Sequence, residues 1–369
     1  MERQRGLGAK QKEEMITQTV GIRADANDTI AAGHVMRCIT VAKQLISAGC
    51  KVIFFTADEY AGEMLKKAAM QYVCLHTDWY HMEEETAKLR RQLIETGCTK
   101  LLVDSYQVTE KYFRDLSDIC KLIYIDDCFE RICPVDMVVN YNAYYARFPY
   151  EKVYGGGTKL LLGTAYVPLR EEFMSAADNR ECAQSDCDSV NGIADTHVLL
   201  SSGGGDVCNA LSGILSQVME DELLQNVTYD VVVGGFNRNV EELKRQAREH
   251  PNIRLHERVN RMAKLMQGCT AAVSAAGTTL FELCAMQVPT VFFSSADNQQ
   301  YDHEFFAKEE RMLYAGDIRE NRERCLQEIC VGLKRILGDR EMRDRMKKKL
   351  REITDGNGAG RIAEEIIRL

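Results

Sequence analysis

The sequence predicts an α/β protein of two domains, each with a parallel sheet flanked by helices. Short runs rich in β-branched and apolar residues alternate with segments of helical periodicity, which is the pattern of βαβ units. The chain has 369 residues, which is too long for one typical core. A polar segment near the middle interrupts the alternation and marks the division between the two domains.

The first domain follows from the alternation in the first half of the chain. Apolar runs predict strands at TVGIRA (19–24), KVIFFTA (51–57), KLLVD (100–104), KLIYIDD (121–127), MVVN (137–140) and TKLLLG (158–163). Between them, stretches such as VMRCITVAKQLISAG (35–49), HMEEETAKLRRQLIETG (81–97) and TEKYFRDLSDIC (109–120) predict helices. We expect this domain over residues 18–173, after a charged and disordered extension at residues 1–17.

The second domain begins after a polar segment. Residues 174–196 are rich in Ser, Asp and Asn, and we expect a surface linker there. Beyond it, apolar runs predict strands at HVLLSS (197–202), TYDVVVG (228–234), IRLHE (253–257), AAVSAAG (271–277) and TVFFSSA (290–296). The highly charged end of the chain predicts consecutive helices, which complete a domain over residues 197–369.

Composition and charge exclude several classes of function. The net charge is −8 with both signs mixed along the chain, whereas nucleic-acid binding requires a basic face. No apolar run approaches the roughly 20 residues of a membrane helix, and the N-terminal residues do not have the pattern of a secretory signal. We therefore expect a cytoplasmic protein without nucleic-acid or membrane partners, and we expect it to be a monomer.

The 14 cysteines predict free thiols rather than a disulfide framework, because they are scattered through predicted helices and strands. Three pairs are separated by four residues: Cys128/Cys133, Cys182/Cys187 and Cys325/Cys330. None forms C-x-x-C and none has a histidine at ligand spacing, so the sequence gives no reason to expect structural zinc. We expect no metal and no cofactor.

The segment AAGHVMRC (31–38) joins the first predicted strand to the first predicted helix. In a parallel sheet, ligands bind beyond the carboxyl ends of the strands, where free N–H groups at a helix start favour anions. Gly33 allows the backbone to approach a ligand closely, and Arg37 lies on the same helical face as His34. His34 is thus a candidate catalytic residue, although a histidine at this position is more often a cap or a surface residue.

Two other predicted strands of the first domain end in polar residues. LLVDSY places Asp104, Ser105 and Tyr106 at one carboxyl end, and YIDDCFE places Asp126 and Asp127 at another. An acidic strand end beside a histidine can orient the imidazole or hold sugar hydroxyls. The two adjacent aspartates could instead ligate Mg²⁺ or simply begin the next turn, and the sequence leaves these alternatives open.

Glycines occupy the matching position in the second domain. SSGGGDVCNAL (201–211) places Gly203, Gly204 and Gly205 between a strand and a helix, where backbone N–H groups can cradle a phosphate. The segment matches neither the dinucleotide fingerprint nor the P-loop. A plain glycine turn that closes a strand–helix corner is an equally good interpretation.

The segment VSAAGTTLFELCAMQVPTVFFSSADNQQ (273–300) is the most informative. Its N–H and hydroxyl groups at residues 276–279 can hold a second phosphate, and Glu282 can accept hydrogen bonds from a ribose diol. The following strand ends in SADNQQ, which would direct residues 297–299 toward the same cleft. In the alternative interpretation, Thr278 is an N-cap and Glu282 interacts with the helix dipole.

These segments together resemble a known family, the UDP-2,4-diacetamido-2,4,6-trideoxy-β-L-altropyranose hydrolases of pseudaminic acid biosynthesis. The similar segments, in order, are IRADANDTIAAGHVMRCITVAKQL, LLVDSY, IDD, VVNYNA, LLLGTAYVPLREEF, SSGGGD, NRMAKLMQGCTAAVSAAGTTLFELCAMQVPTVFF and ADNQ. They extend from about Gly21 to Tyr301, and GHVMRC, LREEF and ADNQ are the most specific. The polar linker is longer than this family needs and the N-terminal extension is unusual for it.

The resemblance implies a glycosyltransferase-B-like (GT-B) architecture, in which two Rossmann-like domains enclose the active site in an interdomain cleft, as in the transferase that makes lipid II. It implies metal-independent hydrolysis, in which water attacks the anomeric carbon and UDP leaves, as a step toward glycans such as those of flagellin. Catalytic roles are expected for His34, Tyr106 and Asn298. Substrate-binding roles are expected for Arg23, Asp25, Gly33, Arg37, Asp126, Arg170, Gly203, Gly204, Gly205, Ser274, Ala275, Ala276, Gly277, Thr278, Glu282 and Gln299.

Three alternatives share the expected small-molecule UDP-sugar partner. A GT-B glycosyltransferase would pass the sugar to an acceptor instead of water, and fold alone does not separate it from a hydrolase. Transferases of this kind often have an apolar or basic membrane-facing patch, and the first domain has no such pattern. A non-catalytic UDP-sugar-binding protein would bind without turnover. A hydrolysing 2-epimerase should have a different acidic constellation.

Overall fold

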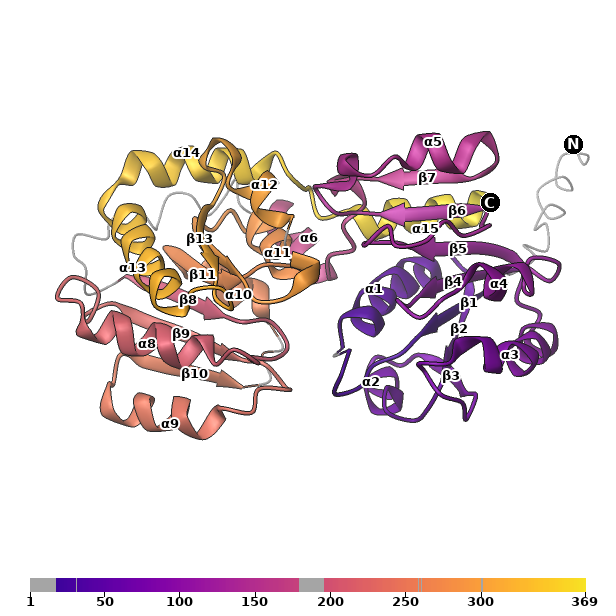
Figure 1. Cartoon of the computed structure of the whole chain (residues 1–369), viewed down its shortest axis with the longest axis horizontal. Coiled ribbons are helices and arrows are strands. Elements are labelled where there is room, and N and C mark those ends of the chain that lie inside the picture. The colour runs from indigo at the N-terminus through magenta and orange to yellow at the C-terminus, as the bar shows by residue number, and fades with distance from the viewer. Residues whose placement is uncertain (1–17, 31, 179–195, 258, 260, 300) are drawn as a thin grey trace, which may run out of the picture.

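The computed structural model describes residues 18–369 except 31, 179–195, 258, 260 and 300. It consists of two α/β domains, each built on a parallel sheet (Figure 1), and confirms the predicted fold class. The predicted N-terminal extension at 1–17 lies outside the described residues, as do residues 179–195 of the predicted linker. The first residues of that predicted linker are helical, because they continue helix α6 (Glu171–Asp178).

The first sheet has seven strands in the described part of the chain, in the order β3-β2-β1-β4-β5-β6-β7. The strands are β1 (Thr19–Ala24), β2 (Lys51–Thr56), β3 (Gln71–Cys74), β4 (Lys100–Asp104), β5 (Lys121–Ile125), β6 (Met137–Asn140) and β7 (Lys159–Leu162). The helices are α1 (Gly33–Ser47), α2 (Gly62–Lys67), α3 (Met82–Thr96), α4 (Glu110–Arg114), α5 (Tyr150–Tyr154) and the 3₁₀ helices η1 (Tyr145–Arg147), η2 (Gly155–Gly157) and η3 (Thr164–Tyr166).

The second sheet has six described strands in the order β10-β9-β8-β11-β12-β13. They are β8 (His197–Ser201), β9 (Thr228–Val233), β10 (Ile253–Glu257), β11 (Ala271–Ala275), β12 (Thr290–Ser294) and β13 (Leu313–Asp317). Its helices are α8 (Ala210–Glu220), α9 (Val240–Glu249), α10 (Met262–Gln267), α11 (Thr278–Ala285), α12 (Asp302–Phe306), α13 (Arg322–Gly338) and α14 (Arg340–Arg351), with 3₁₀ helices η5 (Asp297–Gln299) and η6 (Lys308–Glu310). No helix in the described residues is both long and apolar enough to cross a membrane.

Each sheet reverses its strand order at one point. In the first, β1 lies between β2 and β4, with Ala24 level with Asp104. In the second, β8 lies between β9 and β11, with Ser201 level with Ser274. The loops that follow these strands diverge at the reversal, and in open α/β sheets ligands bind there. The predicted site segments GHVMRC, LLVDSY, SSGGGD and SAAGTT all follow strands at these two points.

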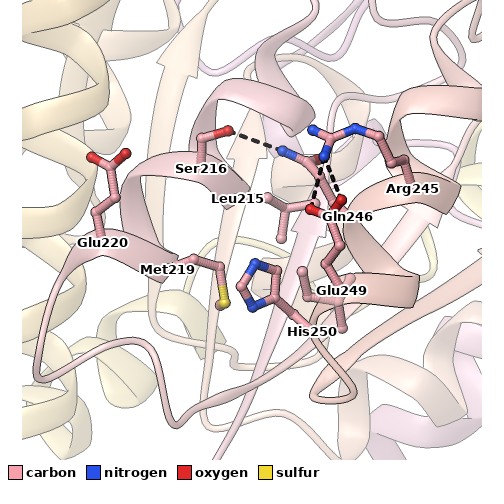
Figure 2. Close-up of a pocket in the computed structure, with 9 residues that line it drawn as sticks. Leu215, Ser216, Met219, Glu220, Arg245, Gln246, Glu249 and His250 are labelled. Carbon is pink, nitrogen blue, oxygen red and sulfur yellow. Dashed lines mark hydrogen bonds and ion pairs between the residues drawn. The ribbon is translucent and has the colours of Figure 1, made fainter.

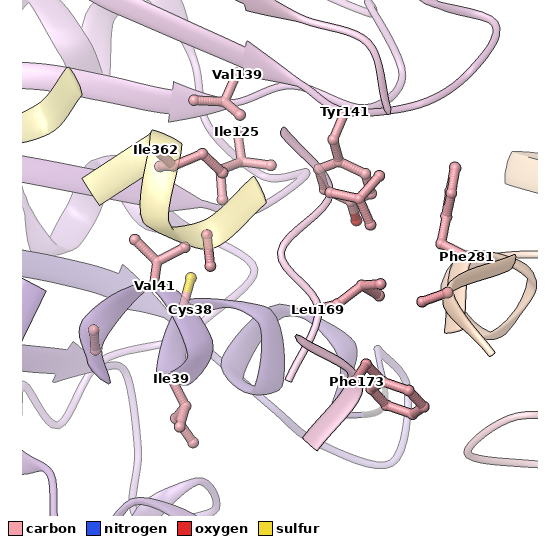
Figure 3. Packing of buried hydrophobic residues seen from close by; sticks show 14 of the residues in the cluster. Cys38, Ile39, Val41, Ile125, Val139, Tyr141, Leu169, Phe173, Phe281 and Ile362 are labelled. Atoms are coloured by element: carbon pink, nitrogen blue, oxygen red, sulfur yellow. The ribbon is translucent and has the colours of Figure 1, made fainter. Parts of the chain in front are cut away.

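One cluster of buried side chains extends from the first domain into the second (Figure 3). The Tyr141 ring of the first domain lies edge-on to Phe281 of α11, with ring centroids 6.4 Å apart. Leu169 and Phe173, at the junction between the domains, belong to the same cluster. Near this cluster, Arg147 pairs with Glu304 of α12. The two domains therefore share a packed apolar contact.

The last helix, α15 (Gly358–Arg368), follows the second domain in sequence and packs against α1 of the first domain. Its Ile362 is buried in the cluster with Cys38 and Val41 of α1 (Figure 3). The Lys100 ammonium donates hydrogen bonds to the carbonyls of Ile366 and Ile367, both at 2.7 Å. A cation at these unpaired C-terminal carbonyls stabilises the helix end.

The chain therefore passes between the domains twice, once before α6 and once before α15. The two passages touch each other. A Cβ on Gly358 would lie 2.2 Å from the carbonyl oxygen of Val167, and one on Gly356 would lie 3.3 Å from the Cα of Met174. Only glycine permits such close approach of two backbones at residue 358. The predicted boundaries at 173 and 197 remain predictions.

Candidate functional site

His34 lies at the start of α1, where the loop after β1 turns into the helix. The loop is shaped by Asn27, whose side-chain oxygen accepts hydrogen bonds from the N–H groups of Thr29 and Ile30. The imidazole Nδ1 of His34 lies 2.6 Å from Oδ1 of Asp104, at the carboxyl end of β4. The reversal of strand order thus brings together two residues 70 positions apart.

The partner of Nδ1 defines the tautomer of the His34 ring. Asp104 is buried, and burial raises the pKa of its carboxyl, but the charges of Arg37 and His34 outweigh burial and hold that pKa well below its usual value. Nδ1 also lies 3.0 Å from Nη2 of Arg37, which can only donate, but the ionised Asp104 carboxylate is closer and can only accept, so we assign the Nδ1 proton to the bond with Asp104. In the neutral ring Nε2 is then free of a proton and can accept one.

Arg37 connects the acidic strand ends. Its Nε donates to Oδ2 of Asp104 at 2.5 Å and its Nη2 donates to Oδ1 of the same group. Its Nη1 donates to Oδ2 of Asp127 at 2.8 Å and to the Tyr141 hydroxyl at 2.6 Å. The bidentate bond fixes the Asp104 carboxylate, which in turn fixes the His34 ring. Arg37 therefore acts through these carboxylates rather than as an exposed cation.

Tyr106 lies beside His34. Its ring meets the imidazole edge-on with centroids 4.7 Å apart, and its hydroxyl donates to Oδ2 of Asp127 at 3.1 Å. Burial, followed by the Asp127 charge, raises the pKa of Tyr106 above its usual value. The phenol is therefore protonated at neutral pH and is a hydrogen-bond donor. The structure brings three predicted site residues, His34, Arg37 and Tyr106, into one cluster.

Asp126, next to Asp127 in the sequence, is buried and has different hydrogen-bond partners from Asp127. It accepts hydrogen bonds from the N–H of Phe129 at 2.8 Å and from the Tyr150 hydroxyl at 3.0 Å. Burial raises the pKa of the Asp126 carboxyl to about 6, although these hydrogen bonds lower it. Asp126 thus anchors the turn after β5, and Asp127 rather than Asp126 contacts the His34 cluster.

Arg23, in β1, is fully buried. Its guanidinium makes two hydrogen bonds to Glu85 of α3, at 2.7 and 2.8 Å, and one to Asp25. The other oxygen of Asp25 accepts a hydrogen bond from the N–H of Ala57. The Arg23 side chain has no exposed surface to offer a substrate, so its observed contacts are structural. Sequence reasoning gave Glu85 no role, since it lies in an ordinary helical pattern.

The glycine turn of the second domain has one residue in the left-handed region and is in close contact with the loop after β9. Gly203 has φ +79°, which favours glycine, and the carbonyl of Gly204 accepts a hydrogen bond from Phe236. A Cβ on Gly234 would lie 2.4 Å from the Gly204 oxygen, so the loop after β9 presses against the turn. Gly205 leads to Asp206, whose carboxylate accepts hydrogen bonds from the first N–H groups of α8.

Buried polar atoms without partners gather next to this turn. Among the described residues, they include Ser202 Oγ, Asn209 Oδ1 and Asn237 Nδ2. Ser202 precedes the glycines, Asn209 precedes α8, and Asn237 lies in the loop that contacts the turn. Unsatisfied buried polar groups are costly unless water or a ligand completes them. Sequence reasoning missed both asparagines.

The second turn surrounds Gly277, which has φ +113° and is the N-cap of α11. The hydroxyl of buried Ser274 bonds to the carbonyl of Ala275, and the N–H of Ala276 bonds to Phe293. These three residues therefore shape the turn, whereas Thr278 is exposed at the helix start. The amide nitrogen of Gln299 lies 3.8 Å from the Cβ position of Gly277. Asn298 belongs to η5, next to Gln299.

Glu282, one turn into α11, pairs with Arg170 from the junction between the domains, at 3.0 Å. Arg170 also pairs with Glu172 at 3.0 Å, and its guanidinium lies over the Phe173 ring. Burial raises the pKa of the Glu282 carboxyl, and the Arg170 charge opposes that rise. The bridge connects α11 to the junction between the domains through side chains.

A separate pocket of about 240 Å³ lies between α8 and α9 (Figure 2). Gln246 donates to the Ser216 hydroxyl at 2.9 Å, and Arg245 pairs with Glu249 at 2.6 Å on its rim. None of the predicted site residues lines it. The site predicted from sequence is therefore distinct from this hollow.

Comparison with solved structures defines the class of fold. The structure aligns with MurG of Acinetobacter baumannii at a TM-score of 0.66 and 15% identity, over 95% of this chain and all of MurG. It aligns with the UDP-GlcNAc 2-epimerase of Methanocaldococcus jannaschii, solved in complex with UDP-GlcNAc and UDP, at a TM-score of 0.58 and 11% identity, over 96% of this chain and all of the epimerase. The protein has the GT-B fold, as predicted.

Sequence comparison finds more particular relatives. The chain is 21% identical over 345 residues to the spore coat polysaccharide biosynthesis protein SpsG of Bacillus subtilis, covering 93% of this chain and 96% of the relative. It is 23% identical over 291 residues to the UDP-2,4-diacetamido-2,4,6-trideoxy-β-L-altropyranose hydrolase of Campylobacter jejuni, covering 78% and 95%. No family model matches the sequence.

Proposed function

We propose that this protein is a hydrolase that cleaves UDP-2,4-diacetamido-2,4,6-trideoxy-β-L-altropyranose, or a closely related UDP-sugar, to UDP and the free sugar. The observation that carries the proposal is the His34–Asp104 pair at the strand reversal of the first sheet, because it supplies a base with a defined tautomer. The GT-B fold, the glycine turns of the second domain and the hydrolase relative support the choice of substrate.

In the proposed reaction, Nε2 of His34 accepts a proton from water while the water oxygen bonds to the anomeric carbon. The bond between that carbon and the β-phosphate oxygen breaks, and UDP leaves with the electron pair. Asp104 stabilises the imidazolium that forms, and Arg37 holds Asp104 in place. Tyr106 and Asn298 orient the water or the sugar amides. N–H donors at the glycine turns stabilise the charge that develops on the diphosphate.

The test is an NMR time course with that UDP-sugar, the full chain and EDTA, without an acceptor. We expect UDP and free sugar to appear in equal amounts with the configuration at C2 unchanged. Intact substrate would contradict the proposal and favour a transferase or a binding protein, and inversion at C2 would favour an epimerase.

The role of His34 has its own test. His34→Asn should lower kcat by at least about 100-fold, which is the usual contribution of a positioned base, with little change in UDP affinity. His81→Asn is the matched control, because His81 is exposed and pairs only locally with Asp78. Near-normal turnover of His34→Asn would remove this residue from the mechanism.

A further inference from the structure

Tyr141, the residue that follows β6, lies between the His34 cluster and the second domain. It is buried, and it is not among the site residues expected from the sequence. The backbone beside it is fastened, because the N–H of Asn142 donates to the Asn140 side chain at 2.9 Å. The Asn142 amide also donates to the backbone carbonyl of Asp127 at 3.1 Å. The Tyr141 side chain therefore extends from a well-defined part of the loop.

The hydroxyl of Tyr141 completes the hydrogen bonds of Arg37. Nη1 of the guanidinium has two N–H groups, and it donates to Asp127 at 2.8 Å and to the Tyr141 hydroxyl at 2.6 Å. The opposite edge, formed by Nε and Nη2, holds the Asp104 carboxylate. Without the Tyr141 hydroxyl, a buried N–H of Arg37 would lose its acceptor, which is costly. The guanidinium would then shift toward another acceptor, and Asp104 would move with it.

The ring of Tyr141 is held by the second domain. It lies edge-on to Phe281 of α11, with ring centroids 6.4 Å apart (Figure 3). Phe281 in turn packs against Phe306 of α12, with centroids 5.3 Å apart, and both rings are buried. The Arg37 guanidinium lies 5.5 Å from the centroid of the Tyr141 ring. Because a phenol hydroxyl is attached rigidly to its ring, the packing against α11 fixes where the hydroxyl lies.

We propose that Tyr141 is a positioning residue for the base of the proposed reaction, and that the second domain holds Tyr141 in place. Phe281 packs on the Tyr141 ring, and the Tyr141 hydroxyl holds Arg37. Arg37 holds Asp104, which accepts the Nδ1 proton of His34. The alignment of the imidazole therefore depends on the packing of the two domains. The inference rests on the proposed function, because it takes His34 as the base.

A positioning role differs from a purely structural one in its effect on kcat. Tyr141→Phe removes the hydroxyl but keeps the ring that packs on Phe281. We expect kcat for the UDP-sugar to fall by at least about tenfold and UDP affinity to stay within about twofold, because a displaced base loses its alignment with the reacting atoms. Tyr229→Phe is the matched control and should keep the wild-type kcat, since Tyr229 is a buried tyrosine of the second domain whose hydroxyl donates to the carbonyl of Leu224 at 3.0 Å.

Proton NMR of the full chain observes the His34 ring without any substrate. The Nδ1 proton resonates downfield of the amide protons, because its short hydrogen bond to the Asp104 carboxylate deshields it, and loss of the signal in His34→Asn assigns it. We expect this proton to exchange with solvent at least about tenfold faster in Tyr141→Phe than in the wild type or Tyr229→Phe. Phe281→Leu keeps the hydroxyl but weakens the packing on the ring, so it should also accelerate the exchange.

The exchange rate of the His34 proton decides the positioning role. Faster exchange in both Tyr141→Phe and Phe281→Leu supports the proposal, whereas faster exchange in Tyr141→Phe alone overturns the part assigned to the second domain. Equal acceleration in Tyr229→Phe would indicate a general loss of stability and overturn the role of Tyr141. Absence of the downfield signal from the wild type would also overturn it, because Asp104 would then not hold the imidazole.

The same experiment separates this inference from the proposed function. An unchanged exchange rate in Tyr141→Phe overturns the role of Tyr141 and leaves the proposed function intact. If the wild type does not hydrolyse the UDP-sugar but the His34 proton responds as expected, the proposed function fails and the positioning of the imidazole stands. Tyr141→Met also lacks the hydroxyl and fills irregular space, so it replaces Tyr141→Phe if thermal unfolding shows that the latter does not fold.

Discussion

At the scale of single residues, the protein shifts the pKa values of two buried carboxyls at the strand ends in opposite directions. Asp104 is buried but touches Arg37, and its pKa is lowered. Asp126 is equally buried but has only neutral donors, and its pKa is raised. Sequence reasoning identified both as acidic strand ends but did not separate them, because the partners of each come from distant segments. For the same reason the contact between Arg23, for which the resemblance implied substrate binding, and Glu85, 62 positions away, was not foreseen.

The raised pKa of Asp126 predicts a pH-dependent stability. A carboxyl whose folded-state pKa of about 6 exceeds the unfolded value of about 4 stabilises the fold at low pH, and this contribution is lost as pH rises through the folded pKa. Asp126→Asn keeps an acceptor for the Phe129 N–H and avoids the buried charge. We expect it to be more stable than the wild type by about 1–3 kcal/mol at about pH 8, but not at about pH 4.

Urea denaturation at both pH values measures this difference. Asp118→Asn is the control, because a hydrogen bond from Arg90 lowers the pKa of the exposed Asp118 carboxyl. The pH dependence of its stability relative to the wild type should therefore be opposite in sign to that of Asp126→Asn. The same gap between Asp126→Asn and the wild type at both pH values would contradict the prediction.

At the scale of elements, the central strands and the edge strands β7 and β10 were predicted, whereas the edge strands β3 and β13 were not. β1 and β4 are buried on both faces and form continuous apolar runs. β3 (QYVC) and β13 (LYAGD) lie at sheet edges and are mostly half-buried, so their composition has no apolar run to detect. The glycine turns were recognised by composition. The loop after β9 that presses on the first turn was missed, because its contact depends on how the strands are ordered in the sheet.

That contact predicts an effect of Gly234→Ala. The new Cβ would lie 2.4 and 2.5 Å from the carbonyl oxygens of Gly204 and Gly203, so the glycine turn must move. We expect UDP affinity to fall by about tenfold and the free energy of unfolding to drop by about 1–3 kcal/mol. Gly235→Ala is the matched control, since a Cβ there meets nothing within 4 Å. Calorimetry and thermal unfolding measure both effects, and equal behaviour of the two variants would refute the prediction.

At the scale of the whole molecule, the domains are joined by packing, by side chains and by two passages of the chain. Tyr141 and Phe281 bring apolar surface together, and the Arg170–Glu282 pair connects the same regions. The helix α15 returns to α1 and its end is held by Lys100. The sequence indicated helices at the end of the chain but not which domain they pack against. An amphipathic pattern determines which face of a helix is buried, but not which domain buries it.

The contact between the two passages predicts the effect of Gly358→Ala. Its Cβ would overlap the carbonyl oxygen of Val167, a backbone atom that cannot rotate away. We expect a loss of at least about 1–3 kcal/mol in the free energy of unfolding and faster amide exchange in α15. Gly338→Ala, at the end of α13, meets nothing within 4 Å and should be nearly neutral. Hydrogen exchange measured by mass spectrometry tests this prediction. If the amides of α15 exchange no faster than those of the other helices, the destabilisation is uniform and the prediction is contradicted.

The paired passages at Val167 and Gly358 also limit how the domains can move. A single tether would allow one domain to twist, slide and bend relative to the other. Here the two connecting segments touch each other. A rotation of one domain about that contact is therefore the motion that stretches neither segment. Under the proposed function, a UDP-sugar bound by both domains would be expected to bring them together by this one rotation.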